Sequence, residues 1–308
     1  MRVAVLSAPR RLELVEHPVP VPAAGELLLR VAGCGVCASE LDMWQGSAHV
    51  DYPRFPGHEV SGTVERVGPA VSGFAAGDPV AAWVTERGFA EYVTVKAEYC
   101  FHAGDVPLDL ALAEPLACAV NAVELAAPAL GDDVVIVGAG FMGNLVQKLV
   151  SLKGPREVIV IDTRPDALER ARRLGATRAI DARDDALYDL EADVAFEVTG
   201  VQSALDTLGE VTRMSGKVVI VGFHQGGSRE LPLAAWNWMA FEIVNAHFRE
   251  VATIMRGMRT GMRLLTSGRI ALDDLVTHRF GLDRVNEAFA TAVEKPPGFV
   301  KATVTVER

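Results

Sequence analysis

The chain has 308 residues and a formal net charge of −10 at pH 7, and its length fits about two domains. Hydrophobic residues make up 50% of the chain and charged residues 23%, which is the composition of a globular protein. The excess of acidic residues disfavours binding to nucleic acids or to anionic membrane surfaces. Four cysteines are too few for a disulfide scaffold, and no signal peptide or membrane span is evident, so we expect a cytoplasmic protein with free or metal-bound thiols.

The first third of the chain is predicted to be rich in β-structure, because short runs of Val and Leu alternate with turns of Gly and Pro. The expected strands are residues 2–6, 11–16, 26–32, 62–67, 79–83 and 90–95. Their spacing is typical of a small, irregular antiparallel barrel or sandwich.

From about residue 117, strands and helices alternate. The expected strands are residues 134–137, 157–161, 178–180, 193–198 and 217–221, and the expected helices between them are residues 141–152, 165–174 and 202–212. This alternation predicts an α/β domain with a doubly wound parallel sheet. A helix from about residue 250 to 266 follows, and then the short strands return. We therefore expect a discontinuous β-rich domain, residues 1–117 and 269–308, interrupted by a dinucleotide-binding domain, residues 118–268.

A glycine-rich turn follows the first strand of the predicted parallel sheet. It reads Gly138-Ala139-Gly140-Phe141-Met142-Gly143 and fits the pattern G-x-G-x-x-G. Gly138 allows the tight turn, Gly140 lets the backbone approach a pyrophosphate, and Gly143 lets the helix pack closely on the sheet. The first turn of that helix, which contains Phe141 and Met142, presents unpaired N–H groups to the phosphates.

The next strand ends in Asp162, 19 residues after Gly143, which is close to the spacing of an acidic ribose ligand. Its carboxylate would accept hydrogen bonds from the ribose hydroxyls and repel a 2′-phosphate, which predicts NAD rather than NADP. Arg164 would favour a 2′-phosphate if it pairs with one, although a solvated surface charge is its more ordinary role. At the end of a later strand, backbone groups of Val221 are expected to meet the nicotinamide.

Cysteine, histidine and carboxylate side chains occur in three short segments before the glycine-rich turn. Cys37 lies in the first, His58 and Glu59 in the second, and Glu114 and Cys118 in the third. A catalytic zinc site uses these ligand types and keeps one coordination position open. The wide spacing is not that of a zinc knuckle, so the pattern alone only indicates a metal site.

These segments, together with the Rossmann unit that follows, resemble the zinc-dependent medium-chain dehydrogenase/reductases. The segments read G-C-G-V-C-A-S-E at residues 33–40, G-H-E-V-S-G at residues 57–62 and E-P-L-A-C at residues 114–118. The resemblance extends over nearly the whole chain. It implies a GroES-like catalytic domain around a Rossmann domain, which agrees with the organisation predicted above.

The resemblance also implies roles for individual residues. Cys37 and His58 match the first two zinc ligands, and Glu114 matches a third ligand that is Cys, Asp or Glu in different members. Glu59 matches an exchangeable ligand or close neighbour of the metal. Ser39 matches the hydroxyl that hydrogen-bonds the substrate oxygen and begins the proton relay. Cys37, Ser39, His58 and Glu59 are therefore the expected catalytic group.

Several positions differ from the family pattern or leave an alternative open. Cys118, four residues after Glu114 and one turn away if this segment is helical, is the alternative third ligand. Glu40 stands where an Asp usually orients the ligand histidine. Residues 81–88 contain no cysteine where the family has four that bind a structural zinc, so we expect one catalytic zinc per chain and no structural zinc. Asp42 replaces a relay histidine, and the relay would end through water, Asp42 or His49.

The activity implied by the resemblance is NAD-dependent oxidation of a secondary alcohol to a ketone. Glu114 is similar to the polyol- and sugar-dehydrogenase branch, which favours a polyol, sugar or cyclitol as the small-molecule substrate. Trp44 and Phe89 are expected to line the substrate cleft. The family's habit implies a homodimer or homotetramer that associates through an edge strand at residues 242–248.

Two other functions compete with this prediction. The first is a zinc-free, NADPH-dependent enoyl or quinone reductase of the same fold, against which Asp162 and the set of metal-ligating side chains argue. The second is a nucleotide-binding protein without catalytic activity, against which the complete ligand set argues.

Overall fold

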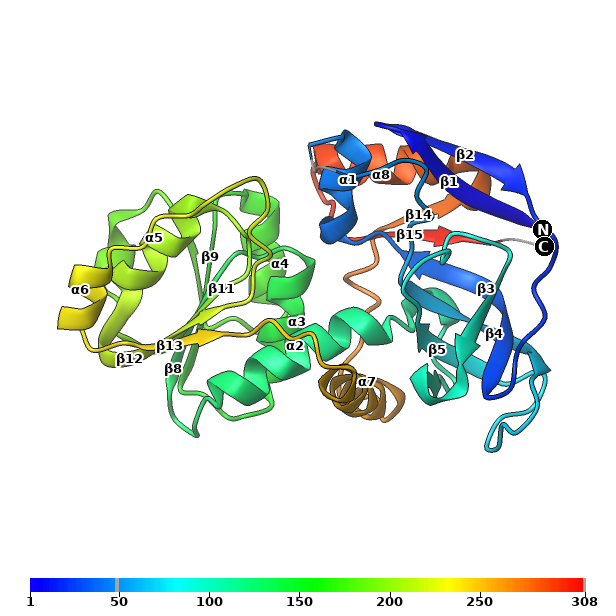
Figure 1. The fold of residues 1–308 in the computed structure, drawn as a ribbon. Helices are drawn as coiled ribbons and strands as arrows, with labels where there is room; N and C mark the ends of the chain where they lie inside the picture. The colour runs from blue at the N-terminus through cyan, green and yellow to red at the C-terminus, as the bar shows by residue number, and fades with distance from the viewer. Residues whose placement is uncertain (48–49, 307–308) are drawn as a thin grey trace. The chain divides into compact units, whose positions relative to one another are not determined.

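The computed structural model describes residues 1–47 and 50–306 (Figure 1). By its internal contacts the chain divides into two compact units. Unit 1 comprises Met1–Ala117 and Ile254–Arg308, and unit 2 comprises Cys118–Thr253. The two-domain α/β architecture predicted from the sequence is confirmed.

The second boundary between the units lies before most of helix α7 (Val251–Thr266), whereas the sequence analysis placed it after residue 268. Most of α7 belongs to unit 1 because two of its glycines pack closely against residues of that unit. A Cβ atom on Gly257 would lie 2.9 Å from the carbonyl oxygen of Ala117, and one on Gly261 would lie 2.8 Å from Cβ of Leu116. These glycines let α7 approach the first turn of α2 (Ala113–Ala126) closely.

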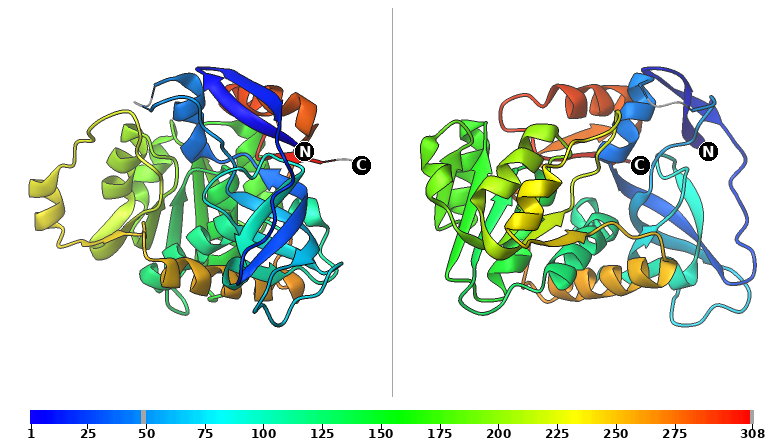
Figure 2. Two further views of the ribbon diagram at one scale, coloured as in Figure 1. Left: turned by 45° about the vertical axis from the view of Figure 1, so that its right-hand side comes forward. Right: turned by 60° about the vertical axis from the view of Figure 1, so that its left-hand side comes forward.

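Unit 1 contains a hairpin and a larger sheet that is mainly antiparallel (Figure 2). The hairpin strands are β1 (Arg2–Ala8) and β2 (Arg11–Glu16). The sheet has the order β14-β15-β3-β4-β5-β7, and β6 also pairs with β3. The strands of this sheet are β3 (Glu26–Gly35), β4 (Glu59–Val67), β5 (Pro79–Trp83), β6 (Tyr92–Lys96), β7 (Cys100–His102), β14 (His278–Gly281) and β15 (Ala302–Thr305).

Two helices of unit 1 besides α2 and α7 close its hydrophobic core. They are α1 (Leu41–Gln45) and α8 (Val285–Glu294). Phe289 of α8 is fully buried, and its ring centroid lies 6.1 Å from that of Trp44 and 5.5 Å from that of Phe89. The prediction that Trp44 and Phe89 line a substrate cleft is therefore wrong, because both rings are buried in the core of unit 1.

The register of three strands in unit 1 brings distant parts of the chain together. Gly35, the last residue of β3, pairs with Glu59 at the start of β4. On its other side Gly35 pairs with Thr303 of β15. Residues that flank these positions, Cys37, His58 and Lys301, therefore lie at one end of the sheet.

Unit 2 is built on a parallel sheet whose strand order is β10-β9-β8-β11-β12-β13. This is the doubly wound order in which the direction of connection reverses between the first and fourth strands. The strands are β8 (Asp133–Val137), β9 (Glu157–Asp162), β10 (Arg178–Asp181), β11 (Ala192–Glu197), β12 (Thr212–Ile220) and β13 (Glu242–Asn245). The predicted Rossmann architecture is confirmed.

Helices cover both faces of this sheet (Figures 1 and 2). They are α3 (Phe141–Ser151), α4 (Pro165–Arg173), α5 (Gln202–Val211) and α6 (Leu233–Trp238). Val135 and Ile159 pack in one core cluster with Leu208 of α5, while Val134 and Val158 point to the opposite face and are also buried. Burial on both faces explains why these strands are continuous apolar runs rather than alternating ones.

Two further predictions about the elements differ from the structure. The strand expected at residues 242–248 ends at Asn245, and the helices α1, α2 and α6 were not predicted. No helix in the described part of the chain is both long and apolar enough to cross a membrane.

Candidate functional site

Three of the predicted metal-ligating side chains converge in unit 1. Cys37 follows β3, His58 precedes β4, and Glu59 begins β4. One ligand atom from each lies within 4.8 Å of the other two. Among residues 1–47 and 50–306, no other group of three such side chains has its ligand atoms this close together. Sulfur, imidazole nitrogen and carboxylate oxygen form a donor set that suits zinc.

The orientation of His58 is set by the buried carboxylate of Glu40. Nδ1 of His58 lies 3.1 Å from Oε1 of Glu40, and the same oxygen accepts a hydrogen bond of 2.7 Å from the backbone N–H of Gly57. Nε2 is thereby left for a metal ion. The side chain of Glu40 is thus long enough to reach the histidine. Burial opposes the charged imidazolium, but Glu40 and Cys37 outweigh it and raise the pKa of His58 well above its ordinary value.

A glycine pair fixes the turn that carries His58. Gly57 has a φ of +104°, and a Cβ atom on it would lie 2.7 Å from the backbone nitrogen of Phe89. Gly88 donates a hydrogen bond of 3.0 Å to the carbonyl of Gly57, and its own Cβ would lie 2.8 Å from that carbonyl. The connection between β5 and β6, which contains Gly88, therefore packs against the turn that carries His58.

Ser39 is exposed and lies beside the metal-ligating cluster on the 3-10 helix Ala38–Glu40. Its hydroxyl donates a hydrogen bond of 3.2 Å to Sγ of Cys37. This places the hydroxyl next to a predicted ligand. Of the residues proposed to end the proton relay, Asp42 is half-buried in α1, whereas His49 lies outside the described residues.

Glu59 has a partner that the sequence analysis missed. Nζ of Lys301 donates a hydrogen bond of 2.8 Å to Oε1 of Glu59 and lies 2.7 Å from Oε2. Both side chains are buried, and the lysine passes over Gly35, where any side chain would meet the Glu59 carboxylate. Burial opposes the charge of Lys301, but the negative charges of Glu59, Cys37 and Glu114 outweigh it and raise the pKa of the lysine.

The donor set offers a test of whether a zinc ion fits the site. Oε2 of Glu59 is buried and lies 2.7 Å from Nζ of Lys301, so an ammonium group already balances its charge. The fit therefore rests on the thiol, the imidazole and the carboxylate, whose ligand atoms lie within 4.8 Å of one another. The chemistry of these three residues fits a bound zinc ion.

Glu114 and Cys118, the two candidates for a further ligand, lie one turn apart on α2. Neither belongs to the group whose ligand atoms lie within 4.8 Å of one another, as far as the described residues show. Glu114 is close enough to Lys301 for its negative charge to help raise the pKa of that lysine. Its charge therefore acts in the same region as that of Glu59.

The remaining cysteines are structural. Cys34 and Cys100 are both buried in the core of unit 1. Burial raises the pKa of the Cys100 thiol to about 12 and raises that of Cys34 well above its ordinary value. Neither belongs to the group of ligand atoms that lie within 4.8 Å of one another among the described residues.

The glycine-rich turn of unit 2 has the geometry of a phosphate cradle. Gly138 adopts a φ of +114°, and Gly143 has no room for a side chain because the carbonyl of Gly138 occupies that space. By contrast, a Cβ atom on Gly140 would meet nothing within 4 Å, so open space lies beside the backbone there. Gly140 also caps α3, which then continues from Phe141 and Met142. A pyrophosphate fits this open space at the N-terminus of the helix.

Asp162 lies beside this turn at the end of β9. Its Oδ2 accepts a hydrogen bond of 2.7 Å from the backbone N–H of Ala139, and its Oδ1 accepts one of 2.9 Å from the N–H of Arg164. Nε of Arg164 lies 3.4 Å from the same Oδ1. The guanidinium of Arg164 is thus drawn toward the carboxylate. Val221, after β12, donates its N–H to the carbonyl of Glu197 at 2.8 Å.

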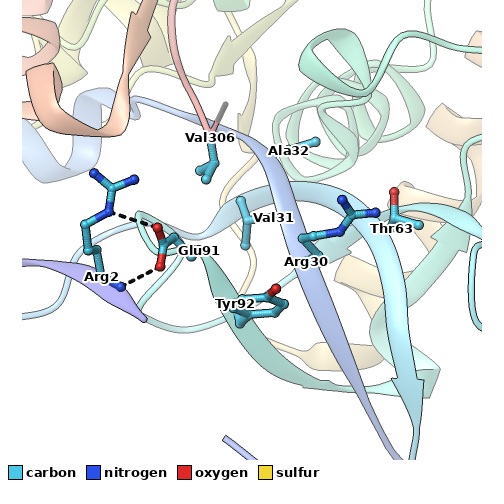
Figure 3. A pocket seen from close by; sticks show the side chains of 8 residues that line it. All are labelled: Arg2, Arg30, Val31, Ala32, Thr63, Glu91, Tyr92 and Val306. Atoms are coloured by element: carbon cyan, nitrogen blue, oxygen red, sulfur yellow. Dashed lines mark hydrogen bonds and ion pairs between the residues drawn. The ribbon is translucent and has the colours of Figure 1, made fainter. Parts of the chain in front are cut away.

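A pocket of about 520 Å³ lies elsewhere on unit 1 (Figure 3). It is lined by Arg2, Arg30, Val31, Ala32, Thr63, Glu91, Tyr92 and Val306. Arg2 donates two hydrogen bonds of 2.8 Å to the carboxylate of Glu91, one from its backbone N–H and one from Nε (Figure 3). None of the predicted site residues is among the eight that line this pocket, and we assign it no part in the chemistry.

Comparisons with known proteins show the family of the chain. The model for the alcohol dehydrogenase GroES-like domain matches residues 23–105, and the model for zinc-binding dehydrogenases matches residues 124–262. Sorbitol dehydrogenase from Gallus gallus is 30% identical over 329 residues, which cover 91% of this chain and 90% of that protein. L-threonine 3-dehydrogenase from Pyrococcus abyssi is 29% identical over 319 residues, 90% of each protein. A cobalt- and zinc-bound thermostable alcohol dehydrogenase from Pyrobaculum aerophilum is 27% identical, with a TM-score of 0.88 over 99% of both chains.

Proposed function

The chain belongs to the zinc-dependent medium-chain dehydrogenases, and from this premise we propose that it catalyses the reversible, NAD-dependent oxidation of a secondary alcohol to a ketone. Membership of this family makes it an oxidoreductase that uses a nucleotide cofactor and a small-molecule alcohol. The observation that carries the proposal is the cluster of Cys37, His58 and Glu59.

Each residue of the cluster has a task in this proposal. Cys37 and His58 would hold a catalytic zinc ion, with Glu59 as an exchangeable ligand and Glu114 or Cys118 as a further one. When bound, zinc supplies Lewis-acid polarisation, which makes the hydroxyl proton of the substrate acidic near neutral pH.

Three other residues prepare the reaction. Ser39 accepts the hydroxyl proton of the substrate as it releases its own proton to the rest of the relay, which ends through water, Asp42 or His49. For this step the Ser39 hydroxyl must turn from Cys37 Sγ toward the substrate. Glu40 keeps the ring of His58 in one orientation through the contact with Nδ1. Asp162 binds the adenosine ribose of the cofactor and thereby favours NAD over NADP.

We favour a polyol, a sugar or a cyclitol as the substrate. Glu114 stands where the polyol- and sugar-dehydrogenase branch has a glutamate, and a sorbitol dehydrogenase is among the relatives. We also propose that the chain binds one zinc ion and no structural zinc, since residues 81–88 contain no cysteine. Association into a dimer or tetramer through the edge strand β13 remains part of the proposal.

Elemental analysis, combined with turnover assays on polyols and secondary alcohols, tests this proposal. We expect about one zinc ion per chain, as one catalytic site requires, together with NAD-dependent alcohol oxidation. Two zinc ions per chain would contradict the absence of a structural site. A metal-free protein that oxidises NADPH with an enoyl or quinone substrate would instead identify a zinc-free reductase.

Replacing Asp162 with alanine is expected to weaken NAD binding by about 1.5–3 kcal/mol, the value of a hydrogen bond to a charged group. The variant loses the ribose acceptor and also the contact that holds the N–H of Ala139 in the glycine-rich turn. Calorimetric titration with NAD and NADP measures the change, and NADP binding should weaken less because a repulsive charge is removed. Glu169→Ala, on the exposed face of α4, is the control. An unchanged NAD dissociation constant in Asp162→Ala would remove Asp162 from the cofactor site.

A further inference from the structure

A buried carboxylate at the end of β11 takes no part in the function proposed above. Glu197 is fully buried. Its Oε1 accepts hydrogen bonds from the backbone N–H of Thr199 at 2.5 Å, from the Thr199 hydroxyl at 2.6 Å and from the N–H of Gly200 at 2.7 Å. The carboxylate therefore fixes the turn that follows β11.

The other oxygen of this carboxylate binds a histidine from a different loop. Nε2 of His224, which follows β12, lies 2.9 Å from Oε2 of Glu197. Nδ1 of His224 is buried and has no hydrogen-bond partner among the residues described. A carboxylate oxygen accepts hydrogen bonds, so Nε2 of His224 is the donor in this contact.

The loops joined by this hydrogen bond are also packed backbone against backbone. A Cβ atom on Gly200 would lie 2.6 Å from the carbonyl oxygen of Phe223, and Gly222 has no room for a side chain beside Gly200. Nη2 of Arg229 donates a hydrogen bond of 3.1 Å to the carbonyl of Gly200, which also links the two loops. Nε2 of His247, which follows β13, lies 3.0 Å from the carbonyl oxygen of Gly222.

This pair of loops lies where one half of a dinucleotide is bound. In a doubly wound sheet the ligand lies outside the carboxyl ends of the strands, across the point where the strand order reverses. Asp162 ends a strand of the half that takes the adenosine. Glu197 and His224 follow strands of the other half, which is left for the nicotinamide. A Cβ atom on Gly138 would lie 2.5 Å from Cγ2 of Thr199, so the loop pair abuts the glycine-rich turn.

We propose that His224 is a positioning residue for the nicotinamide half of the cofactor. By donating to Glu197 it holds residues 221–224 against the turn at residues 199–200, which fixes the backbone on which the nicotinamide lies. The inference rests on the proposed function, because it requires a dinucleotide in unit 2. It adds to that function a hydrogen bond that affects the binding of the nicotinamide half of the cofactor and not of the adenosine half.

Comparison of NADH with ADP-ribose, which lacks the nicotinamide, tests this proposal by calorimetric titration of the zinc-loaded protein. His224→Leu is expected to weaken NADH binding about tenfold, the net value of one hydrogen bond, and to change ADP-ribose binding by less than about twofold. His224→Gln, whose amide also donates, should restore most of the NADH affinity. If the leucine variant does not fold, His224→Asn, which is too short to reach Glu197, supplies the same comparison.

Arg213→Leu is the matched control, because it breaks a pairing between the same two strands at their opposite ends. Nε of Arg213 lies 2.7 Å from Oδ1 of Asp193, and we expect this variant to bind both ligands as the parent protein does. Equal weakening of NADH and ADP-ribose by His224→Leu would show a merely structural role and overturn the inference, as would unchanged NADH binding. A parent protein that binds ADP-ribose but not NADH, or neither, would overturn the proposed function itself.

Discussion

Cys37→Ser and His58→Ala are each expected to remove bound zinc and to lower turnover by about a thousandfold or more, because metal polarisation is worth several kcal/mol of transition-state stabilisation. Serine replaces a soft thiolate with a hydroxyl that is not ionised at neutral pH, and it replaces the sulfur that accepts the Ser39 hydrogen bond with a smaller oxygen. Alanine at position 58 removes a ligand and leaves the buried Glu40 without its imidazole partner.

Zinc content, kcat and NADH affinity are measured on each variant. NADH affinity should stay near that of the parent protein, because the predicted cofactor residues belong to unit 2. Loss of zinc and turnover together with unchanged NADH binding would thus place the defect in the metal site and not in the fold as a whole.

Two matched variants of unit 1 serve as controls. Cys100→Ser alters a buried thiol that is not a thiolate at neutral pH, and His102→Ala alters an exposed histidine whose Nε2 lies 3.0 Å from the carbonyl of Gly73. Both should keep zinc and turnover. The zinc site proposed here would be wrong if Cys37→Ser or His58→Ala retained the metal content and the rate of the parent protein.

Much of the fold was predictable because burial leaves a direct pattern in the sequence. Strands such as β8 and β9 are buried on both faces, so they are continuous apolar runs between turns, and their alternation with helices indicates a parallel sheet.

The helix α2 was not predicted, because burial also hides its periodicity. It is apolar on most of its surface, so no amphipathic period marks it, and Pro115 stands in its first turn.

The site was only partly predictable, because its geometry depends on pairings between distant strands. The motifs identify Cys37, His58 and Glu59 as candidates, but their approach follows from the register of Gly35 with Glu59. Lys301 stands directly before the last strand and belongs to no motif. Its place beside Glu59 follows only from the pairing of β15 with β3, which local sequence does not reveal.

Glu197 and His224 were missed for the same physical reason. Each stands just beyond or at the end of a buried strand, where the sequence shows only a polar residue near a turn. Their contact depends on β11 and β12 being neighbours in the sheet. Trp44 and Phe89 were assigned to a substrate cleft but lie in the core. Large aromatic side chains occur both in buried cores and in the walls of clefts, so the sequence alone does not distinguish the two.

Lys301→Met is expected to lower the free energy of unfolding of the zinc-free protein by about 3–5 kcal/mol, the usual effect of removing one partner of a buried ion pair. Methionine retains most of the length and apolar volume of lysine but not its charge. The carboxylate of Glu59 is then left buried without the ammonium group that lies 2.7 Å from its Oε2. Denaturant unfolding after chelation of the metal measures the loss.

The neighbouring carboxylate provides an internal check on this explanation. In the double variant Lys301→Met/Glu59→Gln no uncompensated charge remains, so part of the lost stability should return. Arg173→Met is the matched control, because Arg173 forms an exposed ion pair of 2.9 Å with Glu169, and such pairs contribute about 0–1 kcal/mol. A loss of less than about 1 kcal/mol in Lys301→Met would mean that Glu59 does not depend on the lysine.

The removal of Lys301 should have opposite effects on zinc affinity and on the stability of the zinc-free protein. Lys301 places a positive charge beside Glu59, and a bound zinc ion would share that carboxylate and be repelled by the ammonium group. Lys301→Met is therefore expected to bind zinc more tightly than the parent protein, although its zinc-free form is less stable, and added zinc should recover part of the lost stability. Competition with a chromophoric chelator measures the affinity. Weaker zinc binding in this variant would indicate that the lysine is needed to shape the site, and the opposition between Lys301 and the metal proposed here would then be wrong.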